Sequence, residues 1–144
     1  IDRRQLVHDW YEMRLVYTPE VTRLAALRAT EEEIEKIAQC EAKTADLIRR
    51  GEVFSAADME FHIAIAQASH NLVFIRMTPM LSESLSLARG ELYQVMGQKH
   101  DRTGLDNILH YHAEMLRYIR KRDGEGAALA TRYHVKCGME DMGF

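Results

Sequence analysis

Residues 112–134 read HAEMLRYIRKRDGEGAALATRYH, and this stretch decides the fold class. Its apolar residues recur at spacings of three and four, which is the periodicity of an amphipathic helix. Asp123 stands between two such runs and can cap the second, because an aspartate side chain accepts hydrogen bonds from the N–H groups of a first helical turn. Helices joined by so short a connection lie antiparallel. The stretch therefore predicts a helical hairpin.

The same spacing extends over most of the 144 residues, which include only two prolines and eight glycines. Because these two residue types are the strongest helix breakers, their scarcity favours packed helices throughout. The sequence predicts seven helical segments, at about Arg3–Val16, from Thr18, from Thr30 to Gly51, at Ser55–Ser69, at Leu72–Val95, around Ile108–Ile119 and from Asp123 onward. The predicted fold is all-α, an antiparallel helical bundle that forms a single domain over residues 1–144.

Several predicted helix starts carry residues that suit them. Thr18 and Pro19 have the character of an N-cap and a first helical residue, since proline lacks only an N–H that the first turn leaves unbonded. Thr30 and Glu33 have the spacing of a capping box. Ser55 can cap the helix that follows it. These signals place three helix starts in the first half of the chain.

The second half of the chain contains a predicted kink and a predicted loop. Pro79 lies inside the predicted helix Leu72–Val95, where it removes one backbone hydrogen bond and clashes with the preceding turn. We therefore expect a kink at this proline. The glycine-bearing stretch Gly97–Gly104 is the predicted loop.

Composition and charge exclude several classes of protein. The formal net charge of −3 offers no basic surplus for binding a phosphate backbone. Cys40 and Cys137 lie far apart without a CxxC spacing, which suits free thiols better than a disulfide framework. No apolar run approaches the roughly 18 residues of a membrane span, and the first ten residues lack the apolar core of a signal peptide. We expect a cytoplasmic protein and, because it begins with Ile1 rather than Met, part of a longer chain.

Four polar residues could carry chemistry together. Asp58 and His62 are four positions apart, so on a helix both side chains point to one face, one turn apart. Alone, this pair also fits an ordinary solvated surface pair. His112 and His134 each fall on the apolar stripe of a predicted helix, so both imidazoles are predicted to face the interior. Polar groups placed there need partners.

Three imidazoles and one carboxylate match the ligands that Zn²⁺, Ni²⁺, Co²⁺ or Mn²⁺ accepts, and the lack of a thiolate argues against a structural zinc clip. A single buried histidine is more often bonded to a carbonyl, and that alternative stays open at this point. His110 provides a contrast, because two residues along a helix turn a side chain by about 200°. It lines up with polar residues, so we expect it to face solvent.

Three stretches resemble a known family. Residues 13–34, residues 58–71 (DMEFHIAIAQASHN) and residues 112–134 resemble the FCD ligand-sensing domain, the C-terminal domain of FadR-type GntR transcription regulators. The specific part is a D-x-x-x-H pair followed by two histidines 22 positions apart. The resemblance implies an antiparallel bundle of six or seven helices enclosing a cavity that holds a divalent metal, zinc before nickel, cobalt or manganese. The implied ligands are Asp58, His62, His112 and His134.

The resemblance also implies an effector. Family members commonly bind small carboxylates such as organic acids, sugar acids or amino acids, and read them with the metal and an arginine of the first helix. Arg14 has that position, and its planar guanidinium could hold a carboxylate through two parallel hydrogen bonds, with a surface salt bridge as the alternative. Thr18 replaces an acid that the family often has, which leaves the effector class open. Asn71 matches a family asparagine that contacts the ligand, although a helix cap explains it equally well.

The implied function is that of the effector-binding and dimerisation domain of a metabolite-responsive bacterial transcription regulator. Such regulators form homodimers and read DNA through an N-terminal winged helix-turn-helix domain, which these residues do not include. DNA contact is therefore expected only through that other domain, and no membrane contact is expected.

Two other functions fit a metal site. A metal-dependent hydrolase activates water at open metal positions, and His8-Asp9 and His100-Asp101 supply the dipeptide of HD-type phosphohydrolases. The flanking ligands and a second acid to act as general base are missing, so we expect no enzyme. In a structural dimerisation module the metal would only stabilise the bundle. A chelator would lower the stability of such a module, and no metabolite would change it.

Overall fold

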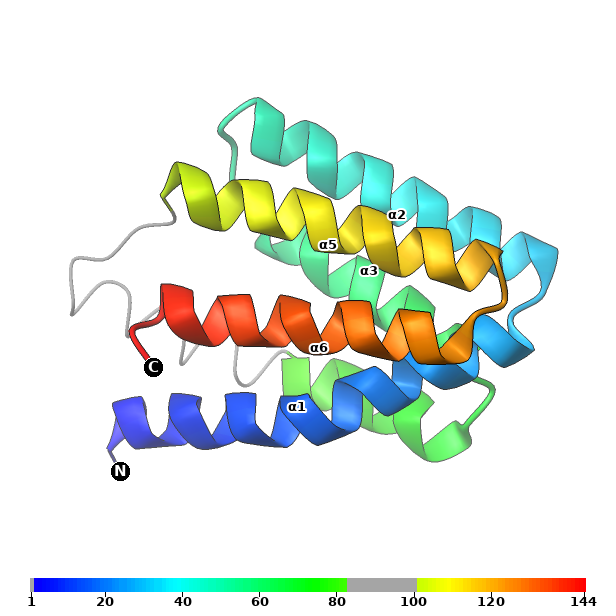
Figure 1. Ribbon diagram of the computed structural model, residues 1–144, viewed down its shortest axis with the longest axis horizontal. Coiled ribbons are helices and arrows are strands. Elements are labelled where there is room, and N and C mark those ends of the chain that lie inside the picture. Colours follow the sequence, from blue (N-terminus) through cyan, green and yellow to red (C-terminus); the bar gives the residue numbers. More distant parts are fainter. Residues whose placement is uncertain (1, 83–100) are drawn as a thin grey trace.

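The computed structural model describes residues 2–82 and 101–144 of the chain. Its helices are α1 (Arg3–Arg28), α2 (Glu31–Arg49), α3 (Ser55–Ala68), α5 (Arg102–Arg120) and α6 (Gly124–Asp141), and residues 72–82 are also helical. Within these two ranges there is no strand, and no helix is long and apolar enough to cross a membrane. Helices that follow one another in sequence run in opposite directions (Figure 1). The prediction of an all-α antiparallel bundle is confirmed.

The first two predicted helices form one helix. α1 continues through Pro19, so the predicted helix start at Thr18 is wrong. Proline has no N–H to donate to the carbonyl of Leu15, four residues earlier. A side chain from another helix occupies that carbonyl, because Arg132 Nη1 of α6 donates to the Leu15 oxygen at 3.4 Å. α1 changes direction along its length in Figure 1, as a helix with an interior proline does.

Of three other predicted helix caps, two are confirmed and one is wrong. Thr30 Oγ1 accepts from the N–H of Glu33 at 3.1 Å, and the Glu33 carboxylate accepts from the N–H of Thr30 at 2.8 Å, which completes the capping box. Asp123 accepts a hydrogen bond from the first turn of α6. Ser55 is not a cap, because helical hydrogen bonding already begins at the carbonyl of Phe54.

The predicted helix Leu72–Val95 is helical over residues 72–82, where its description ends. Pro79 lies within this helical part. Residues 83–95 lie outside the described residues, and the kink stays a prediction.

α5 begins earlier than the sequence suggested. Its cap is Asp101, whose carboxylate accepts from the N–H of Gly104 at 2.7 Å. The predicted loop Gly97–Gly104 is therefore too long at its C-terminal end, because an aspartate cap lets the helix start before this glycine. Residues 97–100 lie outside the described residues.

The core lies where the helices α1, α3, α5 and α6 come together, and α2 adds Ile34, Ile37 and Cys40 to it. α6 packs against α1 and α5, and α3 packs against α1 and α2. A small buried cluster of Val7, Tyr11, Val135 and Met142 joins α1 to α6. Both cysteines are free thiols, as expected. This packing turns one face of each of the four helices toward a shared interior.

Candidate metal centre

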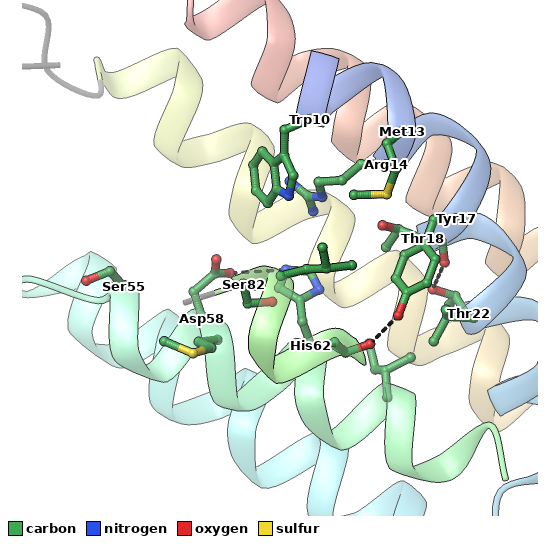
Figure 2. Close-up of a pocket in the computed structure, with 15 residues that line it drawn as sticks. Trp10, Met13, Arg14, Tyr17, Thr18, Thr22, Ser55, Asp58, His62 and Ser82 are labelled. Carbon is green, nitrogen blue, oxygen red and sulfur yellow. Dashed lines mark hydrogen bonds and ion pairs between the residues drawn. The ribbon is translucent and has the colours of Figure 1, made fainter. Parts of the chain in front are cut away.

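Asp58 and His62 lie one turn apart on the inward face of α3. Their facing atoms, Asp58 Oδ1 and His62 Nε2, are 3.5 Å apart. The two side chains are only 20% and 13% exposed, which excludes the alternative of a solvated surface pair. Figure 2 shows both side chains directed away from the α3 axis toward the space below α1.

α5 and α6 bring two further imidazoles to the same place. His112 of α5 is 2% exposed, and its Nε2 lies 3.3 Å from Asp58 Oδ1. The rings of His112 and His134 have centroids 4.7 Å apart. One nitrogen from each of His62, His112 and His134 lies within 4.8 Å of the other two. The structure thus brings together all four residues that the sequence suggested as metal ligands.

One nitrogen of this cluster is buried without a partner. The His112 ring stacks on Phe61 at a centroid distance of 4.3 Å, which fixes its orientation. Its Nε2 is buried and makes no hydrogen bond, because the nearby Asp58 oxygen lies outside hydrogen-bonding geometry. A buried polar atom left in this state costs about 1–3 kcal/mol. No carbonyl group bonds to this nitrogen, so the alternative of a histidine bonded to a carbonyl does not apply to Nε2. A bound metal ion would give this nitrogen a partner.

The spacing of the ligand atoms also suits a single ion. Nitrogen and oxygen ligands lie about 2.0–2.2 Å from Zn²⁺, so neighbouring ligands are about 3–3.5 Å apart and opposite ligands about 4.2 Å apart. Both distances from Asp58 Oδ1, 3.3 and 3.5 Å, fall in the first range. The nitrogen atoms of the three imidazoles lie up to 4.8 Å apart, slightly more than the distance of about 4.2 Å between opposite ligands. Side-chain shifts of a few tenths of an ångström would close the set around one ion.

The charges of the cluster are those that metal binding requires. Burial opposes ionisation of Asp58, but the three histidines outweigh it and hold the pKa of this carboxyl well below its ordinary value. Burial lowers the pKa of His112 to about 4, although the Asp58 carboxylate opposes this effect. Burial, aided by the two other imidazoles, also holds the pKa of His134 well below its ordinary value. Near neutral pH the site has an ionised carboxylate and neutral imidazoles at His112 and His134, the forms that coordinate metals.

A cavity opens beside Asp58 and His62, between α1, α3 and the helical residues 72–82 (Figure 2). Its empty volume is about 720 Å³, including open solvent at its mouth. It is lined by Trp10, Met13, Arg14, Tyr17, Thr18, Val21, Thr22, Ser55, Asp58, Met59, His62, Ile65, Thr78, Leu81 and Ser82. We call it the α1–α3 cavity.

A second cavity of about 550 Å³, including open space, lies between α1, α5 and α6. Arg14 and Asp58 line both cavities, and His134 lines only the second. Sequence reasoning missed the polar residues Asn107 and Asp141 in its wall. Nothing in the sequence marked them, because neither belongs to a motif and they lie on different helices.

Arg14 lies on the face of α1 directed toward the candidate metal ligands. Its guanidinium carbon is 4.8 Å from the centre of the Trp10 ring and 5.7 Å from that of Tyr11, within the range of cation–π contact. Its positive charge contributes to the lowered pKa values of His112 and His134. A cation thus lines both cavities beside the candidate centre, and its contact with a carboxylate stays a prediction.

Two other predicted positions have different outcomes. Asn71 Oδ1 accepts from the N–H groups of Val73 and Phe74 at 3.0 and 3.1 Å, so it caps the helical residues 72–82. It lines neither of the two cavities, which favours the cap over a ligand contact. His110 is exposed on the outer face of α5, as predicted.

Comparison with known proteins identifies the class. Residues 9–136 match the model of the FCD domain, and the chain therefore belongs to the FCD domain family. A solved structure, Streptococcus agalactiae GntR, has the same fold, with a TM-score of 0.83 over 96% of this chain and 60% of that chain at 22% identity. The resemblance seen in the sequence is confirmed.

Among curated proteins the chain is similar to transcription regulators. It is 30% identical over 131 residues to the "Putative L-lactate dehydrogenase operon regulatory protein" of Escherichia coli (strain K12), covering 88% of this chain and 48% of that protein. It is 29% identical over 133 residues to the "Galactonate operon transcriptional repressor" of the same strain, covering 88% and 53%. The chain spans about half the length of these relatives, which are regulators rather than enzymes.

Proposed function

We propose that this chain is the effector-binding domain of a bacterial transcription regulator, and that it binds a divalent metal together with a small carboxylate. The observation that carries the proposal is the convergence of Asp58, His62, His112 and His134 beside a cavity that Arg14 lines. Membership of the FCD family and the names of the relatives support the regulatory role.

The proposed metal ligands are one aspartate oxygen and three imidazole nitrogens. This set suits zinc first, and nickel, cobalt or manganese as alternatives. An ion that accepts five or six ligands would keep positions for oxygen atoms of a bound effector. Stacking on Phe61 orients the His112 ring.

The proposed effector places its carboxylate between the metal and Arg14. The guanidinium can donate two parallel hydrogen bonds to a carboxylate, and the metal can bind one of its oxygens. Arg14 belongs to α1, whereas the metal ligands belong to α3, α5 and α6. A carboxylate at this position would therefore connect α1 with the other three helices. Organic acids, sugar acids and amino acids all carry the required group.

In the intact regulator this domain would act within a homodimer in the cytoplasm, with DNA contacted by a separate winged helix-turn-helix domain. An effector changes operator affinity only if it binds one arrangement of the dimer better than another. A ligand that pulls α1 toward the three other helices has this property, because it favours the arrangement in which all four are close.

The test is a thermal-denaturation screen of the zinc-loaded and metal-free protein against small carboxylates. A ligand at about one hundred times its Kd adds roughly 2.7 kcal/mol, which moves the midpoint of a domain this size by several degrees. We expect a shift with one class of carboxylate, only when zinc is present, and no shift in Asp58→Asn. If the chelator lowers the midpoint but no carboxylate raises it, the domain is a structural module that the metal stabilises and that binds no carboxylate effector. Turnover of phosphoesters that Asp58→Asn abolishes would indicate a hydrolase instead.

A further inference from the structure

The α1–α3 cavity is elongated. On α1 its wall runs from Trp10 to Thr22, twelve residues apart, and on α3 it runs from Ser55 to Ile65, ten residues apart. At about 1.5 Å of rise per residue, these walls are about 18 and 15 Å long. A carboxylate at Arg14 would occupy only one part of this length.

The part of the cavity beyond Arg14 is lined by hydroxyl groups. The Tyr17 hydroxyl lies 2.7 Å from Thr78 Oγ1, which joins α1 to the helical residues 72–82. Thr18 adds a further hydroxyl to the same wall, whereas Ser82 lies beside Asp58 (Figure 2). Figure 2 shows Tyr17 and Thr18 displaced along α1 from the Arg14 side chain. The wall thus changes from charged to neutral and polar along α1.

The two hydroxyls of the Tyr17–Thr78 pair keep hydrogen-bonding capacity. The Tyr17 hydroxyl also donates to the Phe74 carbonyl oxygen at 3.4 Å. A hydroxyl group has one donor and two acceptor positions, so with Thr78 donating to Tyr17 each of the two oxygens keeps an acceptor position. Burial raises the pKa of Tyr17, despite its hydrogen bond with Thr78, so the phenol remains protonated near neutral pH. A neutral hydroxyl group of a ligand can therefore donate to either oxygen of this pair.

The spacing along α1 sets the size of such a ligand. Tyr17 and Thr18 are about one helical turn, or 5.4 Å, beyond Arg14. About four carbon–carbon bonds of about 1.5 Å cover this distance. A hydroxyl on the fourth or fifth carbon beyond the carboxylate would reach the Tyr17–Thr78 pair.

From this geometry we propose that the effector is a hydroxylated monocarboxylate of about five or six carbons, with its carboxylate at Arg14 and the metal and its distal hydroxyls at Tyr17 and Thr78. The inference rests on the proposed function and narrows it. The wall described above offers one cation and several hydroxyls, which matches one carboxylate and several hydroxyl groups. Trp10, Met13 and Ile65 would pack against the carbon chain.

The first test compares the Kd values of three carboxylates for the zinc-loaded protein by calorimetric titration. Gluconate has six carbons and distal hydroxyls, hexanoate has the same length without them, and lactate has one hydroxyl but only three carbons. We expect gluconate to bind at least tenfold more tightly than either of the others. Equal binding of gluconate and hexanoate would overturn the hydroxyl assignment, and equal binding of gluconate and lactate would overturn the length assignment, while the proposed function would stand. If succinate or glutamate bound more tightly than gluconate, the class would be wrong. If no carboxylate bound with zinc present, the proposed function would fail as well.

The second test removes single hydroxyls. Thr78→Val and Tyr17→Phe keep the shape of the side chain, and each should raise the Kd of gluconate about two- to tenfold, the usual effect of one neutral hydrogen bond, while leaving that of hexanoate unchanged. Thr44→Val is the matched control, because Thr44 is also a buried threonine but lies on α2 outside the cavity. An equal effect of Thr78→Val on gluconate and hexanoate would overturn the assignment, since loss of folding or packing would affect both ligands.

Discussion

Asp58 Oδ1 on α3 lies 3.3 Å from Nε2 of His112 on α5, and this nitrogen has no hydrogen bond although it is buried. The two atoms belong to residues 54 positions apart in the sequence. Their closeness depends on the packing of two helices rather than on local structure. The predictions below test this cluster and the helices that support it.

Substitution of His112 should abolish high-affinity metal binding. Changes in the groups that merely orient ligands cost about 10- to 100-fold in metal affinity, so His112→Gln, which removes a ligand, should cost more than roughly 100-fold. The measurement is calorimetric titration with Zn²⁺, after circular dichroism has shown that the variant is folded. His110→Gln on the outer face of the same helix is the control and should bind as the unchanged protein does. Equal affinity of the two variants would remove His112 from the site.

The metal-free protein should lose stability as the pH falls from 6.5 toward 4. In this window an unfolded histidine, with a pKa near 6.5, binds a proton that folded His112, with a pKa of about 4, does not bind. The free energy of unfolding therefore keeps this contribution above pH 6.5 and loses it below. For His112 the loss between pH 6.5 and 5 is about 2 kcal/mol, and His134 acts in the same direction. Urea denaturation at several pH values measures this loss. The free energy of unfolding of His112→Gln should depend less steeply on pH.

Arg14 should determine carboxylate binding without determining metal binding. Arg14→Lys keeps the charge but loses the two parallel donors, so the Kd of a bound carboxylate should rise about tenfold, as for the loss of one charge-assisted hydrogen bond. Zn²⁺ titration of the variant should be unchanged. Arg23→Lys, also on α1 but paired with Glu20 outside both cavities, is the matched control. A parallel loss of zinc affinity would instead make Arg14 a structural support of the centre.

The contact between Arg132 and the Leu15 carbonyl should depend on Pro19. Arg132→Ala should lower the free energy of unfolding by about 0.5–1 kcal/mol, because it leaves that carbonyl without its partner. In the Pro19→Ala background the same change should cost less, since the new N–H can donate to Leu15. A double-mutant cycle in urea separates the two effects. Additive values would mean that the arginine does not compensate for the proline.

The fold class and the inward orientation of the candidate ligands could be predicted because both depend on local periodicity. That the four residues meet at one place was implied by the family resemblance. His112 and His134 share their helical faces with apolar residues, and His110, two positions away, does not. The burial of the first and the exposure of the last follow from helix geometry alone. The spacing of Asp58 and His62 has the same basis.

The errors arise where distant residues decide the outcome. Thr18 and Pro19 resemble a helix start, but α1 continues through both. Arg132, more than one hundred residues later, donates to the carbonyl of Leu15 that the proline leaves free. Local sequence patterns could not predict the walls of the two cavities either, because these walls combine side chains from three or more segments. Asn71 shows a third case, in which one residue type fits two roles and only the observed hydrogen bonds decide between them.

The distribution of the four candidate ligands over α3, α5 and α6 has a consequence for the kinetics of unfolding. His62 and His112 are 50 residues apart, and an ion bound to both closes the intervening chain into a loop. Such a loop can form only after three helices have docked, so the ion would contribute little to the rate-limiting collapse. It would have to leave before α3 separates from α5 and α6. Metal loading should therefore slow unfolding much more than it accelerates refolding.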